Sequence, residues 1–331
     1  MLITRTPFRV SFFGGGSDIP GWFQEHGGQV LSTTIDKYSY VIARELPPYH
    51  DHTIKLSYSR LEKVQNIRDI DHPLIRVVLD YFERNNIEIH HDADLPGSSG
   101  LGTSSSFGVG LVQAISQLEG QELTQKELAN RVITLERTVL KEAGGWQDQI
   151  AAAYGGLKHI TFSTHGAFEV FPLDIGDQIR ADLLAHVMLF YLPTNRLSYE
   201  VSIAKKQHFS DREHSVLTFL SESVTEGITQ LRAGDFQGFG ELLHETWLRK
   251  RELTGVSNIE IDEIYQTGIN AGAHGGKLLG AGGGGFICIF CNVASQERVK
   301  NALSKLLYVP VKIDMKGSQV IFRGIDNYAK K

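Results

Sequence analysis

The 331-residue sequence contains only two cysteines, no long apolar run and no block of basic residues. Two cysteines cannot build a disulfide framework, which is typical of a reducing compartment, so we expect a cytoplasmic protein. The amino-terminal residues lack the apolar segment of a signal peptide, and no run of about 18 apolar residues is present to span a membrane. The formal net charge of −5, from 33 Lys and Arg against 38 Asp and Glu, does not favour a nucleic-acid partner.

Glycine is the residue in excess, with 34 of 331 residues against a usual share of about 7%. Hydrophobic residues make up 41% of the chain and charged residues 21%, which is enough for a packed core. At roughly 100–200 residues per domain, the length fits two domains. We place a loose boundary near residue 180, which predicts domains at residues 1–180 and 181–331.

The hydrophobic pattern predicts an α+β fold. Strands are predicted at residues 2–6, 8–13, 30–35, 38–44, 87–91, 157–162, 168–172, 186–192, 286–290, 308–313 and 320–323. Helices are predicted at residues 74–82, 104–118, 124–140, 212–232, 237–253 and 258–272. Thr124 with Glu127, and Ser257 with Glu260, could form capping boxes. The order of the elements in the second half suggests a ferredoxin-like arrangement.

One glycine-rich segment joins the strand at 87–91 to the helix at 104–118, and its residues 95–106 read LPGSSGLGTSSS. Glycine lets the backbone approach an anion closely and adopt a positive φ angle. The start of the following helix supplies free N–H groups and the positive end of the helix dipole. This chemistry suits a polyphosphate, although an ordinary loop with a serine helix cap would have the same composition.

Two common nucleotide motifs are excluded. No P-loop occurs, because Leu278 follows Gly276-Lys277 and Ala271 stands where the first glycine belongs. A G-x-G-x-x-G run does occur at residues 280–285. A helical pattern precedes that run and a strand follows it, which is the reverse of the order in a dinucleotide-binding fold.

Two more glycine-rich segments, residues 6–18 and 276–286, flank the first one in the sequence. In this order the three segments resemble the GHMP kinase superfamily, which includes galactokinase, homoserine kinase and mevalonate kinase. Residues 96–105 match that family's phosphate loop, P-x-G-x-G-L-G-S-S-A, with one extra residue before Gly100. The resemblance spans nearly the whole chain. It implies a first domain like ribosomal protein S5 domain 2 and a ferredoxin-like second domain.

A narrower resemblance is to the D-glycero-D-manno-heptose 7-phosphate kinases, and it rests on residues 5–9, 14–18, 33–38, 147–149 and 276–285. Galactokinases carry G-E-H-T-D where residues 14–18 here read GGGSD, which disfavours galactose as substrate. The resemblance implies ATP-dependent phosphorylation of an anomeric hydroxyl to give a 1,7-bisphosphate. That step belongs to nucleotide-heptose synthesis for lipopolysaccharide or capsule.

The resemblance also implies a catalytic pair. Asp148 matches the family's catalytic aspartate, and a carboxylate there can take the proton of the acceptor hydroxyl. Arg9 matches the basic residue of the first motif, where a cation would stabilise the carboxylate and the charge that develops on the transferred group. Taken alone, Asp148 would be interpreted as a turn residue and Arg9 as a member of a surface ion pair.

For ATP and magnesium, the resemblance implies a continuous binding segment and one distant carboxylate. The predicted ATP-binding residues are Pro96, Gly97, Ser98, Ser99, Gly100, Leu101, Gly102, Thr103, Ser104 and Ser105. Ser104 matches the hydroxyl that contacts Mg²⁺, and Glu136 matches the carboxylate that completes its coordination in mevalonate kinase. Because Mg²⁺ keeps several waters, two protein oxygens are enough to hold it.

For the acceptor, Asp18 matches the acidic residue that holds sugar hydroxyls in galactokinase, and Gly15, Gly16 and Ser17 would flank the same sugar. Gly282, Gly283 and Gly284 are expected to approach the acceptor through the backbone, because a side chain would block that approach. A phosphate on the acceptor needs positive charge nearby, and Arg196 and Lys277 are the favoured candidates. Four other cations are expected on the surface: Lys205, Lys206, Arg249 and Lys250.

The expected cofactors are therefore ATP and Mg²⁺, and the expected partner is a small-molecule sugar phosphate bound by a monomer or homodimer. Three other functions stay open: a kinase for another free sugar such as fucose or galactose, a lyase like diphosphomevalonate decarboxylase, and a non-catalytic sugar sensor. The joint presence of Arg9, Ser104, Glu136 and Asp148 favours catalysis, because a sensor need not keep the catalytic carboxylate.

Overall fold

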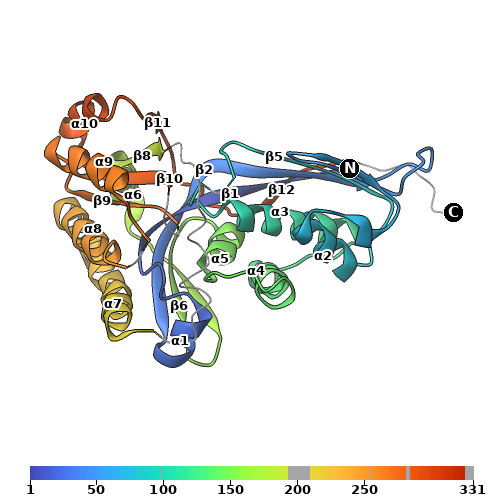
Figure 1. Ribbon diagram of the computed structural model, residues 1–331, viewed down its shortest axis with the longest axis horizontal. Coiled ribbons are helices and arrows are strands. Elements are labelled where there is room, and N and C mark those ends of the chain that lie inside the picture. The colour runs from blue at the N-terminus through green and yellow to red at the C-terminus, as the bar shows by residue number, and fades with distance from the viewer. Residues whose placement is uncertain (98, 193–208, 254, 281–283, 325–331) are drawn as a thin grey trace.

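The computed structural model describes residues 1–97, 99–192, 209–253, 255–280 and 284–324 (Figure 1). Its larger sheet has the strand order β12-β1-β2-β5-β3-β4, and β6 pairs with both β2 and β7. The strands are β1 (Leu2–Phe13), β2 (Gly28–Glu45), β3 (Ile54–Ser57), β4 (Leu61–Val64), β5 (Ile87–Ala93), β6 (Leu157–Phe162), β7 (Phe168–Pro172) and β12 (Gln319–Arg323). The smaller sheet, in the order β11-β8-β10-β9, contains β8 (Val187–Leu192), β9 (Gly275–Leu278), β10 (Gly285–Phe290) and β11 (Leu307–Val309).

The helices form two groups around these sheets (Figure 1). The first group comprises α2 (Pro73–Tyr81), α3 (Thr103–Leu118), α4 (Gln125–Ile133) and α5 (Gln147–Tyr154). The second comprises α7 (Asp211–Ala233), α8 (Phe236–Lys250), α9 (Ile259–Asn270) and α10 (Gln296–Ala302). Two further helices are α1 (Pro20–His26) and α6 (Gly176–His186).

Helix α3 occupies the centre of the first group, where it contacts β1, β2, α4 and α5. Its Leu111, Ala114 and Ile115 are fully buried, as the apolar spacing of this segment predicts. A side chain on Gly110 would meet the Thr6 hydroxyl, so this glycine lets the helix lie close to β1. Close packing of α3 on β1 fixes the start of the helix relative to the strand that carries Arg9.

Strands β1 and β2 are each continuous, so the prediction of two shorter strands in each place is wrong. Their register shifts at Pro7, which pairs with Tyr38, whereas the next residue, Phe8, pairs with Ile35. The two residues of β2 between these partners therefore bulge out of the ladder. Proline has no N–H to donate and is tolerated at such a bulge. Pro7, which in the sequence indicates the end of a strand, therefore lies inside β1.

The helix predicted at residues 124–140 changes its geometry part of the way along. Helix α4 begins with the predicted capping box of Thr124 and Glu127, and the chain continues after Ile133 as a π-helical segment, η2 (Thr134–Val139). Segments of this kind often occur at functional sites, and this one carries Glu136.

The second predicted capping box is wrong. Asn258 caps α9 by accepting a hydrogen bond from the Ile261 N–H at 2.9 Å, while the Ser257 hydroxyl donates to Asp262. Asparagine and serine cap helices about equally well, so the sequence alone does not indicate which of Ser257 and Asn258 is the N-cap residue.

Several helices and strands were not predicted: α1, α5, α6, α10, β3, β4 and β9. Helix α6 lies across the segment where we placed the domain boundary, and β12 pairs with β1 in the larger sheet. The boundary near residue 180 stays a prediction. The strand predicted at 308–313 ends at Val309, because Pro310 cannot donate a ladder hydrogen bond.

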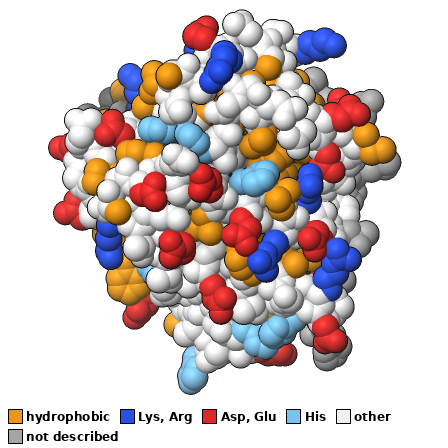
Figure 2. All heavy atoms as spheres, turned by 90° about the vertical axis from the view of Figure 1, so that its left-hand side faces the viewer, with side chains coloured by type: hydrophobic (Ala, Val, Ile, Leu, Met, Phe, Trp, Pro, Cys, Tyr) orange, Lys and Arg blue, Asp and Glu red, His pale blue; other side chains and the backbone are white. Residues whose placement is uncertain are grey.

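Figure 2 shows the face formed by the side of the molecule that lies at the left of Figure 1. Acidic and basic side chains are interspersed there, with apolar and histidine side chains between them. In the described part of the chain, none of the helices combines the length and the apolar composition needed to cross a bilayer.

Candidate active site

A cavity of about 280 Å³ lies between the two groups of helices. The end of β1, the start of α3, the η2 segment and the start of α5 form one side of it. Side chains of α7, α8, β9 and the loop after α8 form the other side. The cavity therefore joins three segments that are far apart in the sequence, namely the three glycine-rich regions.

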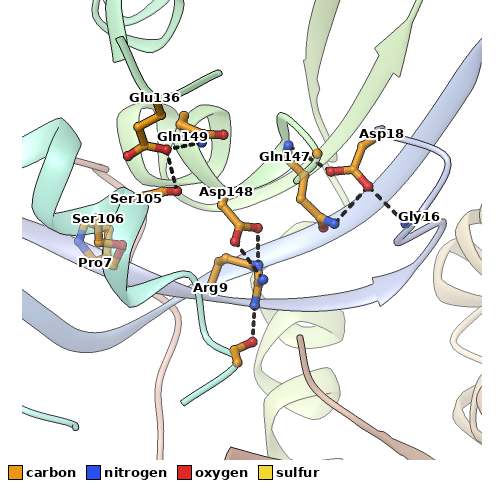
Figure 3. A network of polar contacts seen from close by, with 12 residues as sticks. Pro7, Arg9, Gly16, Asp18, Ser105, Ser106, Glu136, Gln147, Asp148 and Gln149 are labelled. Atoms are coloured by element: carbon orange, nitrogen blue, oxygen red, sulfur yellow. Dashed lines mark hydrogen bonds and ion pairs between the residues drawn. The ribbon is translucent and has the colours of Figure 1, made fainter. Parts of the chain in front are cut away.

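Arg9 and Asp148 form a bidentate ion pair in this cavity (Figure 3). Arg9 donates from Nε to Asp148 Oδ1 at 2.7 Å and from Nη2 to Oδ2 at 2.9 Å. Its third nitrogen, Nη1, donates to the Gly100 carbonyl at 2.5 Å. The side chain of Arg9 is 6% exposed and that of Asp148 is 24% exposed, so the carboxylate is the partner that faces the cavity. The structure thus brings the two predicted catalytic side chains together.

The glycine-rich loop before α3 depends on positive φ angles. Gly100 has φ 80° and Gly102, the N-cap residue of α3, has φ 73°. A side chain at Gly100 would collide with the Leu279 carbonyl, so the loop packs directly on the backbone that follows β9. No side chain caps the start of α3 in the described residues. Its first N–H groups are thus suited to an anion in the cavity.

The predicted ATP-binding segment divides into residues that reach the cavity and residues that do not. Gly100, Gly102, Thr103, Ser104 and Ser105 line the cavity. Pro96 and Gly97 are exposed outside it, Ser99 and Leu101 are buried beneath it, and Ser98 lies outside the described residues. The side chain of Leu101 belongs to the apolar core, so Leu101 could contact a ligand only through its backbone.

Glu136 is 1% exposed and lies beside the start of α3 (Figure 3). Its Oε2 accepts hydrogen bonds from Ser105 Oγ at 3.2 Å and from Gln149 Nε2. Its Oε1 is buried and has no hydrogen-bond partner among the described residues. Burial raises the pKa of Glu136 to about 7. The predicted metal hydroxyl, Ser104, is exposed at the same cavity, whereas the hydroxyl bonded to Glu136 is that of the next residue.

Asp18 lies at the opposite end of the cavity and is 2% exposed. Its Oδ1 accepts hydrogen bonds from the Gly16 N–H at 2.9 Å and from Gln147 Nε2 at 3.1 Å. Its Oδ2 accepts one from the Gln147 N–H, in the first turn of α5. Burial raises the pKa of Asp18, and the nearby charge of Asp148 raises it further.

The other predicted acceptor residues differ in their placement. Gly15 and Gly16 line the cavity, but the Ser17 hydroxyl donates to the Gly14 and Gln29 carbonyls and does not reach it, so the geometry does not support a contact of Ser17 with substrate. Gly284 is buried and is not part of the cavity lining. Arg196, Gly282 and Gly283 lie outside the described residues.

Two lysines lie at the same end of the cavity as Asp18. Lys277 is 7% exposed, and its Nζ donates to the Phe12 carbonyl at 3.0 Å. Lys250, at the end of α8, was expected on the surface but lines the cavity instead, because the last turn of α8 faces the end of β1. Burial lowers the pKa of both ammonium groups.

Sequence reasoning missed further polar side chains in the cavity wall or directly behind it. Gln147 and Gln149 flank Asp148 in α5 and hold Asp18 and Glu136 respectively, so the QDQ tripeptide was the signal that could have identified them. Arg137 donates to the Gly145 carbonyl and fixes the loop that leads into α5. Ser11 turns a hydroxyl without a partner among the described residues toward the cavity.

Comparison with protein families identifies this arrangement. The family model of the GHMP kinases N terminal domain matches residues 72–156, and that of the GHMP kinases C terminal domain matches residues 228–309. The chain is 30% identical to D-glycero-alpha-D-manno-heptose 7-phosphate kinase of Campylobacter jejuni over 314 residues, which cover 91% of this chain and 93% of that protein. The chain therefore belongs to the GHMP kinase family, as its three glycine-rich segments predict.

Other relatives are more distant. The bifunctional fucokinase/GDP-fucose pyrophosphorylase of Arabidopsis thaliana is 27% identical over 88% of this chain, which spans only 30% of that longer protein. Among solved structures, a D-glycero-D-manno-heptose 1-phosphate kinase from Bacteroides thetaiotaomicron superposes with a TM-score of 0.81 at 23% identity, over 98% of this chain and all of that one. Galactokinase of Lactococcus lactis, in complex with galactose, gives 0.75 at 17% identity, covering 96% of this chain and 94% of that one. These structures share the two-domain fold.

Proposed function

We propose that the protein is an ATP-dependent kinase that phosphorylates the anomeric hydroxyl of D-glycero-D-manno-heptose 7-phosphate and forms the 1,7-bisphosphate. The observation that carries this proposal is the Arg9–Asp148 ion pair, which shares one cavity with the start of α3. The similarity to a heptose 7-phosphate kinase over most of both chains supports the choice of acceptor. The reaction would serve nucleotide-heptose synthesis for a surface polysaccharide and, since ATP is the donor, would take place in the cytoplasm.

The phosphates of ATP would lie against the first turn of α3. Backbone N–H groups and the helix dipole attract an anion at a helix start, and Gly100 and Gly102 let the backbone pass close to it. Thr103, Ser104 and Ser105 add hydroxyl groups at the same position.

Glu136 and Ser104 would hold Mg²⁺. Both residues line the cavity, Ser104 is exposed there, and a carboxylate and a hydroxyl are oxygen donors of the kind that a hard cation binds. The ion would neutralise charge on the phosphates. Because burial raises the pKa of Glu136 to about 7, this carboxyl must lose a proton when it binds the ion near neutral pH.

Asp148 would orient the acceptor hydroxyl and accept its proton. Phosphoryl transfer passes through a loose transition state that demands positioning more than a strong base. A carboxylate held by two N–H groups of Arg9 is suited to that task. Arg9 also binds the Gly100 carbonyl, so one side chain sets the position of the carboxylate relative to the phosphate loop. Asp18, fixed by Gly16 and Gln147, would accept hydrogen bonds from the sugar hydroxyls.

Fucose is the second candidate acceptor. Two relatives that cover 88% and 92% of the chain are named as fucokinases, although they match it at only 27% and 25% identity. Four apolar side chains of the cavity wall, Leu217, Leu220, Leu253 and Val256, would suit the methyl group of a deoxy sugar.

A coupled ADP-release assay with heptose 7-phosphate, fucose, galactose, mannose and mevalonate tests the proposal. We expect the highest kcat/KM with heptose 7-phosphate. Turnover of a free sugar at an equal or higher kcat/KM would refute the acceptor assignment but leave the kinase assignment in place. If no acceptor on the panel leads to ADP release, the kinase assignment is refuted and a sugar sensor is favoured.

A further inference from the structure

The acceptor end of the cavity contains more positive than negative groups. Lys250 and Lys277 lie there with a single carboxylate, that of Asp18. Arg9 and Asp148 offset each other's charge through their ion pair. Burial disfavours the charged form of all three groups, since it raises the pKa of Asp18 and lowers the pKa of both lysines. The acceptor end is therefore suited to an anion.

Of the two lysines, Lys250 is the one whose ammonium group has no hydrogen-bond partner among the described residues. Its ammonium group makes no hydrogen bond or ion pair with any of them, although Asp18 and Asp148 are nearby. Asp18 already accepts hydrogen bonds from Gly16 and Gln147, and Asp148 is held by Arg9. A half-buried ammonium group without a hydrogen-bond partner is costly unless a ligand supplies one.

Three hydrogen-bond donors converge beside Gly15, which lines the cavity. A Cβ atom placed on Gly15 would lie 3.9 Å from Lys250 Nζ, 3.3 Å from Ser11 Oγ and 3.5 Å from Gln147 Nε2, so a side chain here would crowd these atoms. All three atoms can donate hydrogen bonds, and Ser11 Oγ has no partner among the described residues. Three donors that converge on one part of the cavity wall, one of them charged, are suited to an anionic oxygen of a ligand.

Lys277 lies close enough to Lys250 for the two positive charges to repel each other. The Nζ of Lys277 donates a hydrogen bond to the Phe12 carbonyl. Among nearby charges, that of Lys250 does most to lower the pKa of Lys277. An anion between or beside the two ammonium groups would relieve their repulsion.

We propose that Lys250, supported by Lys277, binds the phosphate group that the acceptor already carries and so makes the enzyme prefer an anionic sugar over a neutral one. This inference rests on the proposed kinase function. It adds the residue that distinguishes a sugar phosphate from a free sugar.

The neighbouring Arg249 offers a matched control. It carries the same charge one residue earlier in α8, but it pairs with Glu245 at 3.0 Å and covers the ring of Phe219 at 3.9 Å, and it is not part of the cavity lining. Arg249→Met and Lys250→Met therefore remove one positive charge each from adjacent positions, and only the second changes the cavity.

The test is the ratio of kcat/KM for heptose 7-phosphate to kcat/KM for the same heptose without its phosphate. Lys250→Met is expected to lower this ratio about 10- to 100-fold, mainly through a higher KM for the sugar phosphate, which is the range expected for losing one hydrogen bond to a charged group. Arg249→Met should keep the wild-type ratio, and Lys250→Arg should restore most of it. Lys250→Gln is a second neutral variant, to be used if the methionine variant fails a thermal-melting check.

Two results would overturn the inference and leave the kinase assignment intact. One is a neutral variant that keeps the wild-type ratio. The other is a neutral variant that loses the same factor with both acceptors, because that loss would reflect general damage to the site. Failure of the wild-type enzyme to use heptose 7-phosphate is a separate outcome, and it would refute the acceptor assignment on which the inference depends.

Discussion

Replacing Gly102 by alanine tests whether the phosphate loop and the catalytic pair act as one unit. Gly102 is the N-cap residue of α3 with φ 73°, and a Cβ placed on it would lie 3.2 Å from Arg9 Cγ and 3.4 Å from Asp148 Cγ. The first distance is shorter than an ordinary van der Waals contact, so Arg9 must move by a few tenths of an ångström.

Two separate costs follow from this substitution. An alanine at a left-handed φ angle destabilises the folded state by about 1–2 kcal/mol relative to glycine. In addition, Arg9 cannot move without disturbing its hydrogen bonds to Asp148 and to the Gly100 carbonyl. Misplacement of a catalytic group by a fraction of an ångström to one ångström reduces turnover by about 10- to 100-fold, so we expect kcat to fall in that range.

Gly120 provides the matched control, because it has nearly the same φ angle, 74°, and no atom lies within 4 Å of the position of its Cβ. Gly120→Ala should lose a similar free energy of unfolding, measured by urea denaturation, but keep the wild-type kcat. Equal kcat values for Gly102→Ala and Gly120→Ala would refute the idea that Gly102 is needed for the geometry of the catalytic pair.

Two further predictions concern the carboxylates of the cavity. Asp148→Asn should lower kcat by at least about 100-fold with little change in ATP affinity, measured by nucleotide titration, and full activity would remove Asp148 from its assigned role. In metal-free protein, Glu136→Gln should raise the free energy of unfolding at pH 8 by up to about 3 kcal/mol, but by only about 1 kcal/mol at pH 5, because burial raises the pKa of Glu136 from 4.5 to about 7. A carboxyl with a raised pKa in the folded state contributes stability below pH 4.5 and loses that contribution as the pH rises through 7. Urea midpoints whose difference between variant and wild type does not change with pH would contradict the raised pKa of Glu136.

Local sequence signals predicted the glycine-rich loop and the helix after it, whereas the prediction that this loop binds phosphate came from the family resemblance. Glycine placement and the apolar face of residues 104–118 depend on neighbours in the chain, and α3 begins within one residue of the predicted start. The pairing of Arg9 with Asp148 came from the family resemblance, because no local pattern links residues 139 positions apart.

Lys250 shows what the sequence alone does not contain. Its neighbours in α8 have the composition of an exposed helix end, and Arg249 is indeed exposed there with Glu245 as its partner. Whether the next side chain meets water or a cavity depends on how α8 packs against β9 and β1, which is a tertiary property. The same holds for Gln147 in α5. Its side chain donates a hydrogen bond to Asp18, which lies 129 positions earlier in the sequence.

The pairing of β12 with β1 has a consequence for the order in which the enzyme is completed. Leu2, Ile3, Thr4 and Arg5 pair with residues 319–323, so the outer neighbour of the strand that carries Arg9 is among the last parts of the described chain to leave the ribosome. Just before β12, Asp314 donates its N–H to the Thr34 carbonyl and accepts the Gly156 N–H on its own carbonyl. During translation the edge of β1 therefore stays open until this returning segment emerges, and a nascent chain cannot finish its larger sheet before then.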